Sequence, residues 1–357
     1  MKRSVTSVAM CIAAVFTLGW EGSSHSVAAQ DINFAGKTVN MSIGFAAGGG
    51  VDLYGRTMGR YLVQHLPGNP SLVVLNRPGA GGVVALNDWP RRADLTGLSL
   101  TIGAQSQTDP DALNRTKAKF DPATFRMLGG LGAYSQGVFI RNEAMARLND
   151  KSQPPVVVGM VGTTLRGATY TVLWGASFLG WNVKWVMGYQ STAEVRQALE
   201  RGEVEMATFG ASKDFDYVLK TSKVTAIAQT GQVQNGVRVK RPALGDAPIF
   251  SDLVRDKIQD PQARQAFSYW EQLSQVGMWV ALPPETPDTV VDVYLKAFEA
   301  TVNDPAFQND YAKIDPDSIV ASKADIERQL AALAKVSPET MQFLEDELKR
   351  QGFTTGQ

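Results

Sequence analysis

Short apolar runs alternate with amphipathic runs over most of the chain. The apolar run at residues 39–45 precedes a segment in which apolar residues recur every three or four positions as far as His65, as in a helix with one buried face. Leu66, Pro67 and Gly68 end this pattern. Further apolar runs of strand length follow at residues 72–75, 98–103, 125–131 and 137–140. This alternation predicts an α/β fold whose sheets are mostly parallel and flanked by helices.

The same alternation begins again beyond residue 142, after a polar segment at residues 151–155 that contains two prolines. Strands are predicted at residues 156–160, 183–187, 204–209 and 224–229, and helices at residues 162–179 and 192–201. This series predicts a second α/β domain with its own sheet. Another strand is predicted at residues 277–282, and a helix that ends at Asp304 follows it. The charged, helical tail from Lys323 is expected to pack on the outside.

The first 29 residues differ in character from the rest. The basic pair Lys2 and Arg3 precedes an apolar run at residues 8–20, and residues 26–29 are mostly small. This order predicts a secretory signal peptide over residues 1–29. A membrane anchor is the alternative, but the run is shorter than the roughly 20 residues that span a bilayer.

Composition limits the kinds of partner that this chain can have. Of its 357 residues 44% are hydrophobic and 20% are charged, as in globular proteins with a sizeable core. The formal net charge is zero, so charge does not indicate nucleic acid or an anionic membrane as a partner. Cys11 lies in the predicted signal peptide and is the only cysteine, so no disulfide or thiolate metal site is predicted.

Gly48, Gly49 and Gly50 lie between the first predicted strand and its helix. A turn of this kind directs backbone N–H groups at a helix N-terminus toward one place, which makes an anion-binding site. The Walker A lysine and the spacing of the dinucleotide-binding motif are both missing, so no nucleotide is predicted. The alternative is that the glycines only permit a tight turn. Asp52 is predicted to be the N-cap of the helix, a structural role.

Other candidates lie at the carboxyl ends of predicted strands, where ligands of open α/β sheets bind. Arg77, in a second glycine-rich turn at residues 76–82, could pair with a carboxylate or brace the domain. Arg166 lies in the first turn of a helix, where a cation opposes the helix dipole unless an anion binds there; a solvated or ion-paired arginine is the alternative. The remaining candidates are Gln105, Gly162, Thr163, Thr164, Tyr189 and Phe209. Aromatic residues in such chains are also often core, which is the prediction for Trp174, Trp181 and Trp185.

Catalytic motifs are missing from the sequence. Gly210 and Ser212 do not form the G-x-S-x-G motif of hydrolases. His65 is the only histidine beyond the predicted signal peptide, so a histidine-rich metal site is not predicted. The chain is therefore expected not to be an enzyme and to need no cofactor or metal.

Two motifs, in this order, resemble those of the Bug-type solute receptors, the extracytoplasmic binding subunits of tripartite tricarboxylate transporters. They are FAAGGGVD at residues 45–52 and NRPGAGG at residues 76–82. The sequence departs from the family at Gly44, where proline is frequent, and at Gln190 and Ser191, where glycines are usual. These departures leave the identity of the ligand open more than the fold.

The resemblance implies a two-lobed fold of the type II periplasmic-binding-protein kind (Venus flytrap), each lobe a mostly parallel sheet flanked by helices. Lobe 1 would comprise residues 30–140 and 277–357, and lobe 2 residues 141–276. The first glycine turn and a facing loop of lobe 2 would bind a small organic carboxylate. The turn would contribute Phe45, Ala46, Ala47, Gly48, Gly49 and Gly50.

The family also implies a periplasmic location and delivery of the ligand to membrane subunits of a transporter. A monomer is expected, without stable membrane insertion and without nucleic acid as a partner. Two alternatives from other classes stay open: a receptor that serves a membrane sensor, and a periplasmic hydrolase on the same scaffold.

Overall fold

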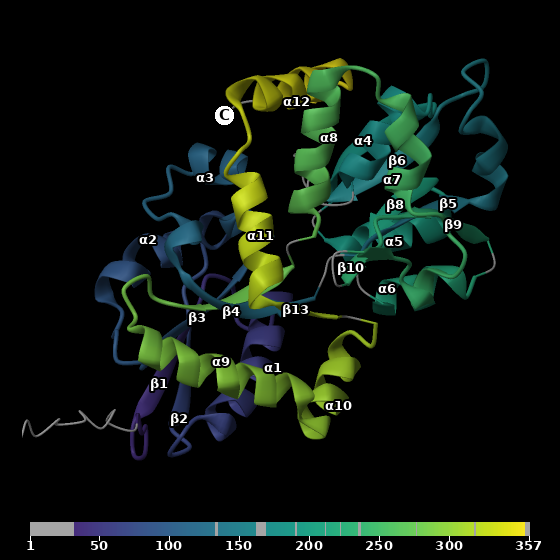
Figure 1. Ribbon diagram of the computed structural model, residues 1–357. Helices are drawn as coiled ribbons and strands as arrows, with labels where there is room; N and C mark the ends of the chain where they lie inside the picture. The colour runs from purple at the N-terminus through teal and green to yellow at the C-terminus, as the bar shows by residue number, and fades with distance from the viewer. Residues whose placement is uncertain are drawn as a thin grey trace, which may run out of the picture. The chain divides into compact units, whose positions relative to one another are not determined.

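The structure of the chain is a computed structural model (Figure 1). It describes residues 32–132, 135–161, 169–189, 191–210, 212–221, 223–234, 237–275, 277–317 and 319–353. Within this part of the chain, Asn33–Gln357 groups into one compact unit. The predicted signal peptide lies outside the described residues.

The first sheet has six strands in the order β13-β4-β12-β3-β1-β2. Strands β1 to β4 run in one direction, while β12 and β13 are antiparallel to their neighbours. Its inner strand β3 is buried along its whole length and the edge strand β2 is half-exposed, as their places in the sheet require. The strands are β1 Thr38–Ile43, β2 Ser71–Asn76, β3 Ser99–Ala104, β4 Arg126–Leu131, β12 Met278–Leu282 and β13 Val320–Ser322.

The second sheet has five strands in the order β7-β6-β8-β5-β9. Only β5 runs against the others. Strand β5 holds the fourth place in this sheet, as β12 does in the first-sheet series β2-β1-β3-β12-β4. Both sheets therefore share one strand arrangement. The predicted α/β fold with two mostly parallel sheets is therefore confirmed. The strands are β5 Gly137–Arg141, β6 Val156–Val161, β7 Val183–Tyr189, β8 Met206–Phe209 and β9 Val224–Gln229.

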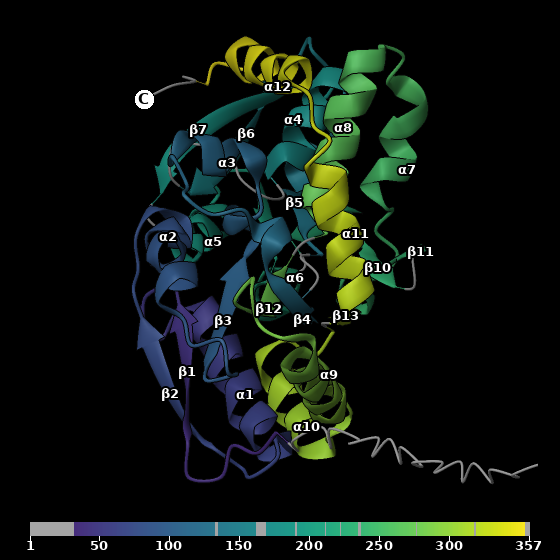
Figure 2. The same ribbon diagram turned by 60° about the vertical axis from the view of Figure 1, so that its left-hand side comes forward.

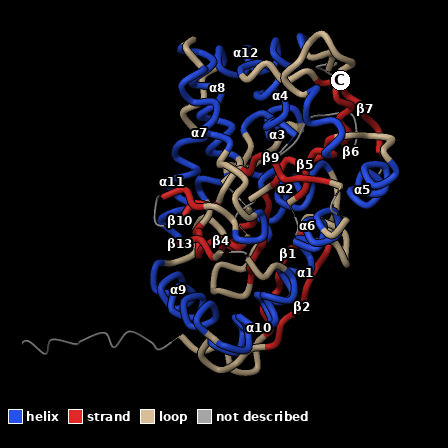
Figure 3. The backbone as a smooth tube through the Cα atoms, turned by 90° about the vertical axis from the view of Figure 1, so that its right-hand side faces the viewer, coloured by secondary structure: helices blue, strands red, loops and turns tan. Residues whose placement is uncertain are grey.

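Helices flank both sheets (Figure 3), and short polar residues or prolines begin many of them. Among the described residues, no helix has the length and apolar character that crossing a membrane requires. The helices are α1 Gly50–His65, α2 Val83–Arg92, α3 Pro110–Arg115, α4 Thr169–Phe178, α5 Thr192–Arg201, α6 Ser212–Leu219, α7 Phe250–Val254, α8 Pro261–Leu273, α9 Asp288–Asn303, α10 Pro305–Ile314, α11 Lys323–Leu333 and α12 Pro338–Arg350. Strands β10 Gln232–Gln234 and β11 Val237–Val239 form a small antiparallel pair.

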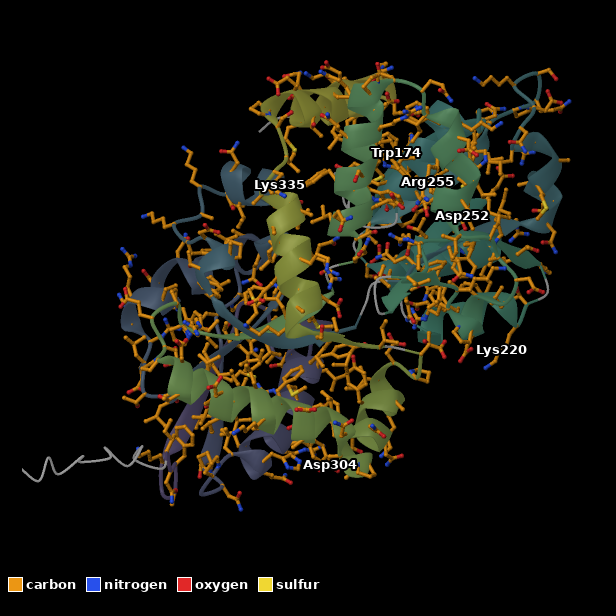
Figure 4. All side chains as sticks on the ribbon, viewed as in Figure 1. Trp174, Lys220, Asp252, Arg255, Asp304 and Lys335 are labelled. Atoms are coloured by element: carbon orange, nitrogen blue, oxygen red, sulfur yellow. The ribbon has the colours of Figure 1, made fainter. Side chains whose placement is uncertain are left out.

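The core contains the predicted tryptophans to different degrees. Trp174 of α4 (Figure 4) is fully buried. Its ring lies edge-on to that of Phe267 of α8. Trp181 is also buried. Trp185 is half-buried, and its ring lies 5.0 Å from that of Phe353 near the C-terminus. The prediction of core positions is thus confirmed for Trp174 and Trp181, and Trp185 lies at the margin of the core.

The chain passes from the first sheet to the second between β4 and β5, and it returns before β12. The lobe boundary predicted after residue 140 falls inside β5, which pairs with β8 and β9. In the C-terminal tail, α12 packs against α8 and its Glu347 accepts a hydrogen bond from Ser177 of α4 (Figures 1 and 2).

Candidate functional site

The first glycine turn connects β1 to α1 and leaves its backbone open. Gly48 has a φ of +79°, a conformation that favours glycine. A Cβ atom built at Gly48 or Gly50 would meet no other atom within 4 Å. Because α1 begins at Gly50, its first N–H groups have no partner within the helix. The backbone of the turn is therefore open on one side, next to the first N–H groups of α1.

Asp52 is not the N-cap of α1, which corrects the prediction. The N-cap residue is Gly49, and Asp52 is the third residue of the helix. Its buried carboxylate accepts hydrogen bonds from the backbone N–H of Gly48 at 2.9 Å, from Asn76 Nδ2 at 2.8 Å and from Arg56 Nε at 2.9 Å. The structural role of Asp52 is thus to hold the turn from inside, with its charge paired.

The second glycine turn lies against the first. A Cβ atom at Gly44 would come within 2.6 Å of Gly82 Cα, so only glycine permits this approach. Asn76 Nδ2 donates to the carbonyl of Phe45 at 3.0 Å, and the backbone N–H of Arg77 donates to Ile43 at 2.9 Å. The ends of β1 and β2 therefore carry their turns to one place.

A third turn, at the end of β3, joins the other two. Ser106 Oγ donates to the carbonyl of Gly81 at 2.7 Å, and Gln107 Nε2 donates to the carbonyl of Gly82 at 3.0 Å. Gln107 Oε1 accepts the backbone N–H of Ala104 at 2.9 Å and is fully buried. Sequence reasoning missed Ser106 and Gln107, although polar residues directly after a buried strand were the signal that could have identified them.

The other predicted residues have different surroundings. Arg77, Ala46 and Ala47 are exposed, and Phe45 is half-buried beside the first turn. Gln105 Nε2 donates to the carbonyl of Leu273 at 2.6 Å, which fixes that side chain at the end of α8.

In the second sheet, Tyr189 ends β7 and is half-buried. Phe209 ends β8, but its ring is buried in the core 5.5 Å from the ring of Phe139. The predicted residues Gly162, Thr163, Thr164 and Arg166 lie outside the described residues. Within the described chain, no group of three acidic, histidine or cysteine side chains is placed to hold a metal ion.

The environment of Asp52 predicts a pH dependence of stability. Burial acts to raise the pKa of the Asp52 carboxyl, but the hydrogen bonds from Arg56, Gly48 and Asn76 outweigh it, and the pKa lies below its usual range. A depressed pKa stabilises the fold above the pKa of the unfolded chain, and that stability is lost as the pH falls from about 5 toward 3. Asp52→Asn should therefore lower the free energy of unfolding at pH 7 by about 1–3 kcal/mol and flatten its dependence on pH in this range.

Urea unfolding between pH 3 and pH 7 measures both effects. Asp88→Asn is the matched control, because Asp88 forms an exposed ion pair with Arg91 across one helical turn, and its change should stay within about 0.5 kcal/mol. An Asp52→Asn protein with the pH dependence of the wild type would contradict the prediction.

Solved structures resemble this chain, whereas no protein-family model and no curated protein sequence matches it. A TctC solute binding protein from Polaromonas superposes with a TM-score of 0.63 at 18% identity, covering 88% of this chain and 98% of that one. An R. palustris protein with adipate superposes with a TM-score of 0.57 at 17% identity, covering 89% and 98%. The periplasmic binding protein BugD gives a TM-score of 0.56 at 21% identity, covering 89% and 99%.

This chain has the fold of the periplasmic binding proteins. Two of the three structures are named as TctC and Bug proteins, the kind that the two glycine-rich motifs resemble. In open α/β sheets, ligands bind outside the carboxyl ends of the strands. In this example of the periplasmic-binding-protein fold, the turns after β1, β2 and β3 meet at such a place.

Proposed function

We propose that this chain is a periplasmic receptor that binds a small organic carboxylate at the three joined turns. The observation that carries the proposal is the contact of Gly44 with Gly82 beside the open backbone of Gly48 and Gly50. It brings the N-terminus of α1 and two strand ends together. The similarity to a protein whose structure was solved with adipate supports a carboxylate as the ligand.

The free energy of ligand binding requires contacts from more than one turn. A dissociation constant of 1 μM corresponds to about 8 kcal/mol. A helix N-terminus contributes about 1 kcal/mol to an anion, and each hydrogen bond to a charged group about 1.5–3 kcal/mol. Because binding also loses translational freedom, we infer that the second sheet contributes, through Tyr189 and the predicted residues Gly162, Thr163, Thr164 and Arg166. In this proposal Arg77 pairs with the carboxylate from the first sheet.

The proposal includes a place in transport. A chain exported by its predicted signal peptide would meet its ligand outside the cytoplasmic membrane. The loaded receptor would then deliver the carboxylate to the membrane subunits of a tripartite tricarboxylate-type transporter. Co-purification of such subunits with the loaded receptor, but not with the empty one, would test this step.

Ligand binding is tested by thermal unfolding of the mature protein with a panel of carboxylates that includes adipate, succinate, malate and benzoate. A ligand that binds only the folded state raises the melting temperature, and a concentration 100 times the dissociation constant stabilises by about 2.7 kcal/mol. No shift with any member of the panel at 10 mM would overturn the proposal.

The first turn is tested by Gly50→Val, which should weaken binding at least tenfold while the protein stays folded. Gly50 has free space around its Cβ position, so the new side chain fills the proposed site without meeting the protein. Gly49→Val is a poorer choice, because its Cβ would lie 3.2 Å from the carbonyl of Ala46. Titration calorimetry with the best ligand of the panel measures the loss.

Ala306→Val is the matched control, since it adds similar bulk at an exposed position in the first turn of α10. Its affinity should equal that of the wild type. Unchanged affinity in a folded Gly50→Val protein would remove the first turn from the site.

A further inference from the structure

A cavity of about 560 Å³ lies among α3, α4, α8 and α12. Most of its lining is apolar or aromatic, and its aromatic residues are Tyr170, Tyr269 and Trp270. Tyr269 donates a hydrogen bond to the carboxylate of Asp109 at the edge of α3. A volume of this size is typical of sites for ligands larger than a short dicarboxylate, since ligand pockets measure roughly 300–1,000 Å³.

The cavity begins where the third turn ends. Gln107 contacts Gly82, and Asp109, which lines the cavity, follows two residues later, a span of at most about 7 Å. The backbone N–H of Asp109 donates to the carbonyl of Gln105 at 3.1 Å. Gln105 in turn donates to Leu273, a second residue of the lining. Direct contacts thus connect the three joined turns to the cavity wall.

Helix α12 supplies the opposite wall and is fixed in place. Met341, Leu344 and Leu348 lie on one face of α12 and line the cavity, at spacings that suit a single helix face. The helix is held by the hydrogen bond from Ser177 to Glu347, and Phe353 beyond it packs on Trp185. The cavity therefore exists before any ligand enters, which lowers the cost of binding.

We propose that this cavity takes the aliphatic or aromatic tail of a monocarboxylate whose charged end binds at the three joined turns. This inference rests on the proposed function and names its ligand class. Apolar and aromatic side chains favour a tail that leaves water, and Asp109 of the cavity wall follows Gln107 of the third turn by only two residues. Helix α12 then determines which tails are accepted.

The experiment compares valerate with 5-phenylvalerate, which differ only in the phenyl group, and uses adipate as a reference. In the wild type, 5-phenylvalerate should bind at least tenfold more tightly than valerate, because the phenyl group is removed from water. In the double variant Met341→Trp/Leu348→Trp the two indole rings occupy the cavity. The gain in affinity of 5-phenylvalerate over valerate should then fall below threefold.

Asp346→Trp is the matched control, because it adds an indole ring to α12 at an exposed position outside the cavity, and it should keep the full gain. Equal affinities for valerate and 5-phenylvalerate in the wild type would overturn the inference, as would a gain that survives in the folded double variant. Adipate distinguishes the two failures. If adipate binds but 5-phenylvalerate binds no more tightly than valerate, only the inference fails. If no carboxylate binds, the proposed function fails with it.

Discussion

Arg241→Met should lower the free energy of unfolding by about 3–5 kcal/mol, because it leaves a buried carboxylate without its cation. The Arg241 side chain is almost fully buried and forms an ion pair with Asp315, which lies between α10 and β13. Its Nη1 donates to the carbonyls of Ser135 and Gly210, each at 2.8 Å, and its Nη2 donates to Ser212 Oγ at 2.5 Å. One side chain thus links the chain between β4 and β5 to segments of both sheets.

Urea unfolding followed by circular dichroism measures this effect. Arg91→Met is the matched control, because Arg91 is exposed and its ion pair with Asp88 spans one helical turn, so its loss should stay below about 0.5 kcal/mol. The double variant Arg241→Met/Asp315→Leu should recover part of the loss, since it removes the unpaired charge. A loss below 1 kcal/mol for Arg241→Met would contradict the importance of this buried pair.

Arg241 also illustrates what the sequence could not supply. It belongs to the short basic stretch RVKR at residues 238–241, a pattern that on its own indicates a solvated surface. Its partner Asp315 is 74 residues away along the chain, and nothing local in the sequence connects them. Contacts of this kind depend on the tertiary fold, so hydrophobic periodicity cannot reveal them.

The strands and most helices could be predicted because burial imposes a period on the sequence. The period does not say which sheet a strand joins. The boundary predicted after residue 140 therefore places most of β5 in the first lobe, whereas β5 pairs with β8 and β9. Nor does the period of the tail say which helix it packs on: the face of α12 that carries Leu344 is buried against α8.

The candidate site was predictable to the extent that it follows from strand ends. The rule that ligands bind outside the carboxyl ends of strands led to the turns after β1, β2 and β3. The contact of Gly44 with Gly82 was not predictable, because a glycine in a turn has several explanations. The N-cap prediction for Asp52 is wrong because Gly49 serves as N-cap itself, and the Asp52 carboxylate reaches back to the N–H of Gly48.

Gly277→Ala should destabilise the protein by at least about 3 kcal/mol, beyond the usual 1–3 kcal/mol for an overpacked core site. A Cβ atom at Gly277 would lie 1.3 Å from the carbonyl oxygen of Gly132 and 2.8 Å from that of Leu131. The first of these atoms directly follows β4 and the second belongs to its last residue, and β4 is held by its pairing with β12. The two segments that connect the sheets therefore run side by side, and neither can move without breaking strand pairs.

Gly50→Ala is the matched control, because its Cβ meets nothing within 4 Å and alanine suits a helix start. Its melting temperature should equal or exceed that of the wild type, whereas Gly277→Ala should melt much lower or fail to fold. A Gly277→Ala protein that melts within 2 °C of the wild type would contradict the close approach. Since receptors with this fold must bring two lobes onto one ligand in the proposed function, a partly folded Gly277→Ala protein should also lose carboxylate binding. Carboxylate binding would then depend on the close approach of Gly277 to Gly132 as well as on that of Gly44 to Gly82.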